Sequence, residues 1–101
     1  MSKVTIDAKA KFNALSNARH IFALKEEAVA FTLVQVIESD DGAKAIAITA
    51  DGEVIGIFMN ARSAITGAKE LLAAFGDEQP QVLVKIRETA KKQSVYYFEI
   101  V

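Results

Sequence analysis

Basic side chains gather near the C-terminal end of the sequence. Lys85, Arg87, Lys91 and Lys92 lie within eight positions of one another, opposed locally by Glu88 alone. Lysine and arginine neutralise phosphate groups, which gives proteins their sequence-independent affinity for nucleic acids. These four residues are therefore candidate phosphate contacts. For Lys91 and Lys92 an ordinary solvated turn explains the charge equally well.

Three consecutive aromatic residues, Tyr96, Tyr97 and Phe98, follow this basic segment. In a strand, Tyr97 points to one face and Tyr96 and Phe98 point to the other. One set must therefore point away from the core, where aromatic rings can stack on bases with about 1–3 kcal/mol per base. The alternative is that these rings fill a barrel core or a dimer interface. We interpret Phe31 and Phe58 as core residues.

Catalytic chemistry has little support in this sequence. Without cysteine there is no thiol nucleophile, disulfide or zinc–thiolate site, and a single histidine, His20, excludes multi-histidine metal sites. The serines have only His20 as a potential general base, and no nucleophile elbow is present. Asp40 and Asp41 are explained by a turn. We predict no enzyme, no catalytic residue, no cofactor and no metal.

The 101 residues are enough for one domain with a small core. About half of them are apolar (51%) and a quarter (25%) are charged, as in ordinary globular proteins. No leader-like segment and no run of 18 apolar residues occurs, so we expect a cytoplasmic protein without a membrane partner. Twelve basic and 13 acidic residues give a net charge of −1. Nucleic acid would therefore have to bind a local basic patch.

That charge is unevenly distributed along the chain. Residues 25–60 carry two basic and seven acidic residues, net −5, whereas residues 1–24 carry four basic residues and one acidic residue, net +3. The acidic pair Asp40–Asp41 would repel phosphate, which counts against binding at that turn. The basic residues of the N-terminal segment could add contacts to nucleic acid. They are Lys3, Lys9, Lys11 and Arg19.

The hydrophobic pattern predicts a mainly β domain. Alternating, β-branched segments predict strands at 29–38, 43–49, 54–59, 82–87 and 95–101. Asp51-Gly52 lies between two apolar runs, a strong hairpin signal, so the first three strands should form an antiparallel meander. Apolar residues with helical spacing predict a helix over 61–75, with Asn60 as N-cap and Gly76 just past its end. Gly67 should weaken this helix by about 1 kcal/mol.

The N-terminal 24 residues are less regular. Residues 4–6 could form a short strand, and residues 8–19 could form a short helix or an irregular arm. We therefore divide the chain into an N-terminal arm, 1–24, and a domain, 25–101. The predicted order of the domain is three strands, a helix and two strands, which is the order of the five-stranded OB-fold barrel. An open sheet with the helix on one side is the rival architecture.

Three stretches of the sequence carry a family resemblance: 22–37, 60–72 and 82–100. They are similar to the entry strand, the inter-strand helix and the basic, aromatic closing hairpin of the compact OB-fold single-stranded-DNA-binding proteins of bacteriophages. The resemblance implies a non-enzymatic protein, a homodimer in the host cytoplasm, that coats single-stranded DNA during replication or recombination. The net charge of −1 departs from this family, because binding to DNA would then depend on a local basic patch.

In this interpretation Lys85, Arg87, Lys91 and Lys92 contact phosphates, and Tyr96 or Tyr97 stacks on bases. RNA remains an open alternative to DNA, because both are bound through stacking and phosphate contacts. The second interpretation is a protein–protein interaction module of a small β-rich fold that binds no nucleic acid. Its aromatic last strand would pair with a partner chain at a sheet edge. The two differ in whether the exposed aromatic set lies in a basic groove or on a flat apolar patch.

Overall fold

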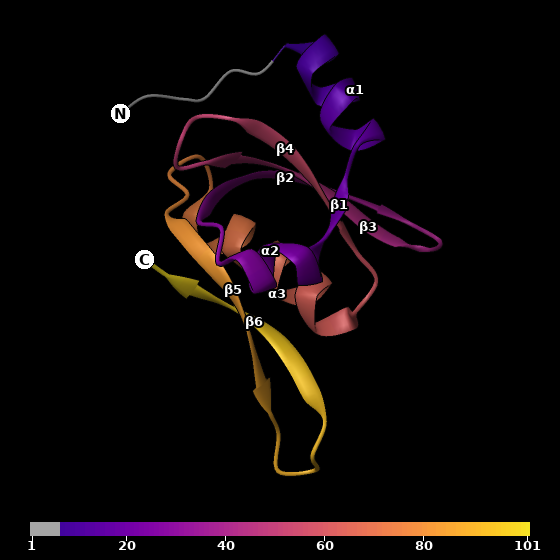
Figure 1. Ribbon diagram of the computed structural model, residues 1–101, viewed down its shortest axis with the longest axis vertical. Helices are drawn as coiled ribbons and strands as arrows, with labels where there is room; N and C mark the ends of the chain where they lie inside the picture. Colours follow the sequence, from indigo (N-terminus) through magenta and orange to yellow (C-terminus); the bar gives the residue numbers. More distant parts are fainter. Residues whose placement is uncertain (1–6) are drawn as a thin grey trace.

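The computed structural model describes residues 7–101, and it is mainly β (Figure 1). The strand expected at residues 4–6 lies outside the described residues. The elements follow in this order: α1 (Ala8–Ser16), β1 (Arg19–His20), α2 (Ile21–Glu27), β2 (Phe31–Ser39), β3 (Gly42–Thr49), β4 (Val54–Met59), α3 (Arg62–Phe75), β5 (Gln81–Glu88) and β6 (Ser94–Ile100). None of these helices has the length and apolarity needed to cross a membrane.

The strands form one curled sheet in the order β1-β4-β3-β2-β5-β6. The meander β2-β3-β4 and the hairpin β5-β6 are antiparallel, as the sequence predicts. Only two residue pairs, Phe31–Val82 and Thr32–Gln81, join these two parts. Within residues 7–101 the sheet therefore resembles half of a barrel, with β1 and β6 as its two edges.

Two details of the predicted fold need correction. The sheet has six strands rather than five, because Arg19–His20 pairs in parallel with Ile57 and Phe58 of β4. This added strand precedes the meander, so the main helix α3 lies between the fourth and fifth strands rather than between the third and fourth. A two-residue strand carries no periodic pattern, so the sequence gives no signal for it.

A β-bulge in β2 produces part of the curl. The register shifts between Leu33, which pairs with Ala47, and Gln35, which pairs with Ile46. Val34 is the extra residue, and such an insertion bends the strand and increases its twist. The shift also explains why apolar residues occupy both alternating sets of this strand.

Helices α2 and α3 pack against one face of the sheet and enclose the core. Ile21 and Leu24 of α2 and Phe31 of β2 are fully buried there. The facing positions of β3 are small residues. They are Ala43, Ala45 and Ala47, each fully buried.

Helix α1 covers the opposite face, over β3 and β4. Its backbone lies directly on Gly56, where an added Cβ would be only 2.0 Å from the carbonyl oxygen of Ala14. Ile46, the cross-strand partner of Gly56, is fully buried. Lys44 Nζ donates a hydrogen bond to the carbonyl of Leu15 at 3.2 Å. The contact therefore depends on the absence of a side chain at position 56.

The helix ends show which polar side chains have structural roles. Asp7 caps α1 by accepting from the backbone N–H of Ala10 at 2.8 Å. His20 caps α2, because its Nδ1 accepts from the N–H of Phe22 at 3.1 Å. The expected N-cap role of Asn60 is wrong: Ala61 occupies that position without a side-chain bond, and Asn60 Oδ1 lies 3.4 Å from His20 Nε2.

Helix α2 lies across the expected boundary between the N-terminal arm and the domain, at residues 24 and 25. It packs against β5 and β4. Its buried residues belong to the same core as the strands.

Gly76 ends helix α3 with φ 58°, in agreement with the sequence pattern, which placed this glycine just past the end of the helix.

Candidate nucleic-acid interface

The β5–β6 hairpin sorts the basic and aromatic residues onto two faces. Lys85 lies opposite Tyr97, and Arg87 lies opposite Val95. Directly opposed residues share a face, so Lys85, Arg87 and Tyr97 lie together on the face turned away from the core. We call these three residues the hairpin face. Tyr96 and Phe98 point the other way and pack against the core.

Arg87 and Tyr97 form a close pair on the hairpin face. The guanidinium carbon of Arg87 lies 5.6 Å from the ring centroid of Tyr97, within cation–π distance. Lys85 Nζ instead lies 3.1 Å from Glu99 Oε1. The hydrogen bond to Glu99, and then the charge of that carboxylate, raise the pKa of Lys85 above 10.5. Glu99 therefore competes with a phosphate for Lys85, so Arg87 is the stronger candidate phosphate ligand of the two.

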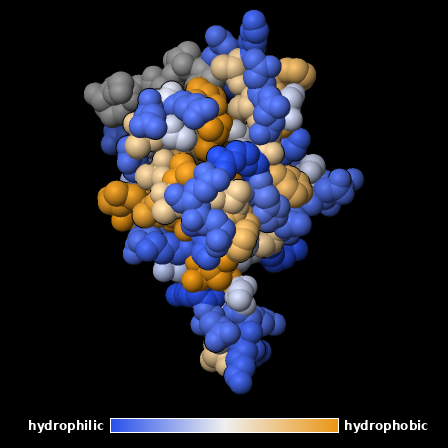
Figure 2. All heavy atoms as spheres, in the orientation of Figure 1, coloured by the Kyte–Doolittle hydropathy of each residue, from blue (hydrophilic) through white to orange (hydrophobic). Residues whose placement is uncertain are grey.

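Lys91 and Lys92 lie in the turn of the hairpin, which projects from the body (Figure 1). Both are exposed, and Figure 2 shows this projecting end covered almost wholly by hydrophilic side chains. The turn is held by backbone bonds from Thr89 N–H to the Gln93 carbonyl, 2.8 Å, and from Lys92 N–H to the Thr89 carbonyl, 2.9 Å. These lysines are thus separated from the core and free to reach a partner.

A groove of about 740 Å³ lies between α3 and β6. We call it the edge groove. Its lining includes two arginines and four aromatic residues: Arg62, Arg87, Phe75, Tyr96, Tyr97 and Phe98. Glu70 is the only acidic residue in the lining. The groove therefore combines cations with exposed parts of aromatic rings, the combination that single-stranded nucleic acid binds.

Two contacts set the position of α3 beside the edge strand. Ser63 Oγ accepts a hydrogen bond from the backbone N–H of Tyr96 at 3.0 Å. One turn later, a Cβ on Gly67 would lie 3.0 Å from two ring carbons of Phe98. Gly67 therefore permits the close approach of helix and strand, which gives this helix-weakening residue a packing role.

The acidic turn at Asp40 and Asp41 lies beyond the Arg62 end of the edge groove. Asp40 and Asp41 line a smaller hollow of about 330 Å³ together with Arg62. Arg62 thus lies between the carboxylates and the edge groove. A phosphate chain in the groove would be repelled at this end and attracted toward Arg87 and the hairpin.

The unfolding free energy is expected to fall as the pH rises above about 10, because burial raises the pKa of Tyr96 above 10.0. The folded chain then holds the phenolic proton more tightly than the unfolded chain does. The stabilisation that this proton provides is complete below pH 10 and is lost as the pH rises through the pKa of Tyr96 in the folded chain. The raised pKa of Lys85 acts in the same direction.

Urea unfolding of wild type and Tyr96→Phe at about pH 8 and about pH 11 measures this effect. The variant has no phenolic proton, so it should lose less stability than wild type between the two pH values. Equal losses in both proteins would show that Tyr96 does not carry the effect.

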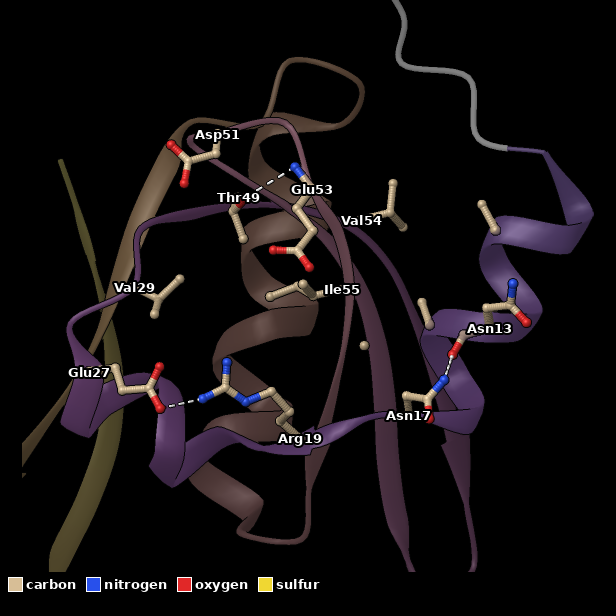
Figure 3. Close-up of a pocket in the computed structure, with 13 residues that line it drawn as sticks. Asn13, Asn17, Arg19, Glu27, Val29, Thr49, Asp51, Glu53, Val54 and Ile55 are labelled. Carbon is tan, nitrogen blue, oxygen red and sulfur yellow. Dashed lines mark hydrogen bonds and ion pairs between the residues drawn. The ribbon is translucent and has the colours of Figure 1, made fainter.

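A polar cleft of about 570 Å³ lies under α1 (Figure 3). Arg19 and Glu27 form an ion pair there, and Asp51 and Glu53 contribute two further carboxylates. Three acidic residues against one arginine disfavour phosphate. No group of three potential metal ligands occurs between residues 7 and 101. The candidate nucleic-acid interface is therefore at the other end of the sheet, at β5 and β6.

The other residues considered in the sequence analysis lie partly inside the fold and partly on its surface. Phe31 is fully buried and its ring lies edge-on to that of Phe98, at 6.3 Å between centroids. Phe58 is partly buried, 5.8 Å from the His20 ring. Phe31 is therefore a core residue, as expected, whereas the core assignment of Phe58 is wrong: Ile57 and Met59 on either side of it are the residues of β4 that enter the core. On the N-terminal segment, Lys9 is exposed and Lys11 is partly buried on α1, away from the hairpin, and Lys3 is outside the described residues.

Sequence reasoning missed the contribution of α3 to the edge groove. The sequence predicts this segment only as an amphipathic helix and gives Arg62 and Phe75 no binding role. Phe75 is 40% exposed and lines the groove. A glycine in the middle of a long amphipathic helix was the available signal, since it marks a close contact.

Comparison with known proteins gives no match to a family model, to a curated protein or to a solved structure.

Proposed function

We propose that this protein binds single-stranded DNA along the edge groove and the adjoining hairpin face. One observation carries the proposal: the groove brings Arg62 and Arg87, from different elements, to the same channel as four aromatic side chains. Bases would stack on the exposed rings while the arginines neutralise phosphates. The binding would be largely independent of sequence, because every base has a face that can stack.

The most suitable stacking residue is Tyr97. Its ring lies on the outward face of β6 at cation–π distance from Arg87, and Tyr97 is also among the residues that line the edge groove. Tyr96 contributes only the part of its ring that the core leaves uncovered. We therefore assign the main stacking role to Tyr97 and a supporting role to Tyr96.

The family resemblance supports the wider setting of this function. It favours an OB-fold-like, non-enzymatic protein that acts as a homodimer in phage or host DNA replication or recombination, in the host cytoplasm. The strand pairing supports the comparison with the OB-fold, because the meander continues into the last hairpin through β2 and β5. RNA is the competing ligand, and a matched RNA oligonucleotide in the same titration separates the two.

Replacing Arg62 and Arg87 together by alanine is expected to weaken single-strand binding for all sequences alike. Neither arginine is engaged in an ion pair among residues 7–101, so both charges are available to phosphates. Each lost phosphate contact should reduce the slope of log affinity against log salt by about 0.7. The double variant should therefore lose about 1.4 from the slope, measured by fluorescence anisotropy of a labelled oligonucleotide at several salt concentrations.

Arg19→Ala is the matched control, because Arg19 is paired with Glu27 in the polar cleft. It should leave affinity and slope unchanged. Lys85→Ala should have a smaller effect than Arg87→Ala, since Glu99 competes with a phosphate for Lys85. An unchanged affinity in the Arg62→Ala, Arg87→Ala double variant would overturn the assignment of the groove. No binding by wild type even at low salt would overturn the function.

A protein-interaction module is the second candidate, and the edge position of β6 favours it. Ile100 is 54% exposed at this edge, where a partner strand could add. However, Ser63 already accepts from the N–H of Tyr96, so part of the edge is occupied. The same anisotropy titration decides between the candidates, because this alternative expects no binding to the oligonucleotide.

A further inference from the structure

The distal half of the β5–β6 hairpin is a two-stranded ribbon that makes no hydrogen bond to the body among the described residues. Strand β5 pairs with β2 only at Gln81 and Val82, and the bond from Tyr96 to Ser63 is the last one to α3. Beyond that point, residues 87–95 make hydrogen bonds only within the hairpin, among the described residues. We call residues 87–95 the arm; it is the part that projects from the body in Figure 1.

The composition of the arm differs from that of the edge groove. It contains Arg87, Lys91 and Lys92 against Glu88, net +2, and the uncharged polar residues Thr89, Gln93 and Ser94. It contains no aromatic residue. Single-stranded binding relies on aromatic stacking, whereas contacts to a duplex backbone use lysine, arginine, threonine, serine and glutamine. The arm therefore suits a duplex better than a single strand.

The dimensions of the arm also suit a duplex. Two strand steps separate the Arg87–Val95 pair from the Thr89–Gln93 bond, which at about 3.3 Å per residue gives about 7 Å before the turn itself. The major groove of B-DNA is about 12 Å wide and about 8.5 Å deep, and it admits a two-stranded ribbon. The two strand steps and the turn together are comparable in length to the depth of the groove, so the turn can enter it while the stem stays at the body.

From this geometry we infer that the protein recognises the junction between single- and double-stranded DNA. The single strand lies in the edge groove, and the arm enters the major groove of the adjoining duplex, where Lys91 and Lys92 contact phosphates. Arg87 connects the two surfaces together with Thr89 and Val95, because these three arm residues also line the edge groove. This inference rests on the proposed function for its single-stranded half.

The test compares three labelled probes by fluorescence anisotropy at low salt: a single strand, a blunt duplex and a duplex with a single-stranded tail. Wild type should bind the tailed duplex about tenfold more tightly than the single strand. Lys91→Glu with Lys92→Glu should remove this preference, because it should weaken binding of the tailed duplex much more than binding of the single strand. Both positions are exposed in a turn, so the variant should fold.

Lys9→Glu with Lys11→Glu is the matched control, since it makes the same change in net charge on α1. It should keep the preference for the tailed duplex. Equal wild-type affinity for the single strand and the tailed duplex would overturn the inference. So would an equal loss of affinity for both probes in the arm variant, because the arm would then serve the single strand alone.

The blunt duplex separates a failure of this inference from a failure of the proposed function. If the single strand does not bind at all, the function of the edge groove is wrong. Duplex binding that is lost in the arm variant but kept in the α1 variant would still support the arm as a duplex-binding element. If the arm variant still binds the blunt duplex, the assignment of the arm as a duplex-binding element is overturned. It is also overturned if wild type does not bind the blunt duplex.

Discussion

Gly56→Ala is expected to destabilise the fold by about 2–3 kcal/mol and to release α1 from the sheet. The added Cβ would lie 2.0 Å from the carbonyl oxygen of Ala14, far inside van der Waals contact, and both groups are backbone or directly attached to it. Overpacking of this kind costs about 1–3 kcal/mol, and a rigid neighbour places it at the upper end. No rotamer change can relieve the overlap, so the helix must move away.

Urea unfolding measures the loss of stability, and hydrogen exchange of the α1 amides measures the release of the helix. Gly52→Ala is the control: the same methyl group meets open space there, at φ 91°, so only the left-handed conformation opposes it. That cost is about 1–2 kcal/mol, without any change in α1 exchange. Unchanged α1 protection in Gly56→Ala would contradict the close packing of helix and strand.

Tyr97→Ala is expected to reduce affinity for single-stranded DNA by at least tenfold. Loss of one stacked base costs about 1–3 kcal/mol, which corresponds to about fivefold to 150-fold in affinity. The substitution also removes the ring that positions Arg87, 5.6 Å from its centroid. Stability should change little by comparison, because Tyr97 lies on the hairpin face and outside the core.

Anisotropy titrations with Tyr97→Phe and Tyr96→Phe provide the matched controls. The first keeps the aromatic face, so it should retain affinity within about threefold. The second removes only a hydroxyl group from a ring that packs mainly against the core. Equal affinity of wild type and Tyr97→Ala would exclude stacking on this residue, and an equal loss in Tyr97→Phe would assign the contact to the hydroxyl group.

The local elements were predictable because each has a short-range signal. Asp51-Gly52 between apolar runs predicted the β3–β4 hairpin, and the stripe ending at Phe75 predicted α3 to within one residue. The alternation through Tyr96, Tyr97 and Phe98 correctly separated the hairpin face from the core-facing residues. Turn residues and side-chain periodicity, both local in the sequence, determine these features, so no knowledge of the tertiary structure was needed.

The tertiary features were not predictable from the same patterns. The pairing of Arg19–His20 with β4 depends on where α1 and α2 place the chain, and two residues cannot show a period. The bulge at Val34 is a property of two strands in register. Likewise, Arg62 and Arg87 are 25 positions apart, and only the packing of α3 beside β6 brings them to one groove.

The methyl groups on the inner face of β3 set the dimensions of a surface that they never touch. Ala43, Ala45 and Ala47 lie under the helices, and α3 is at once the cover of these alanines and one wall of the edge groove. A larger side chain at Ala45 would act as a spacer beneath the helix and displace that wall. A requirement for the proposed DNA binding would therefore also constrain these three buried alanines, although their side chains carry no functional group.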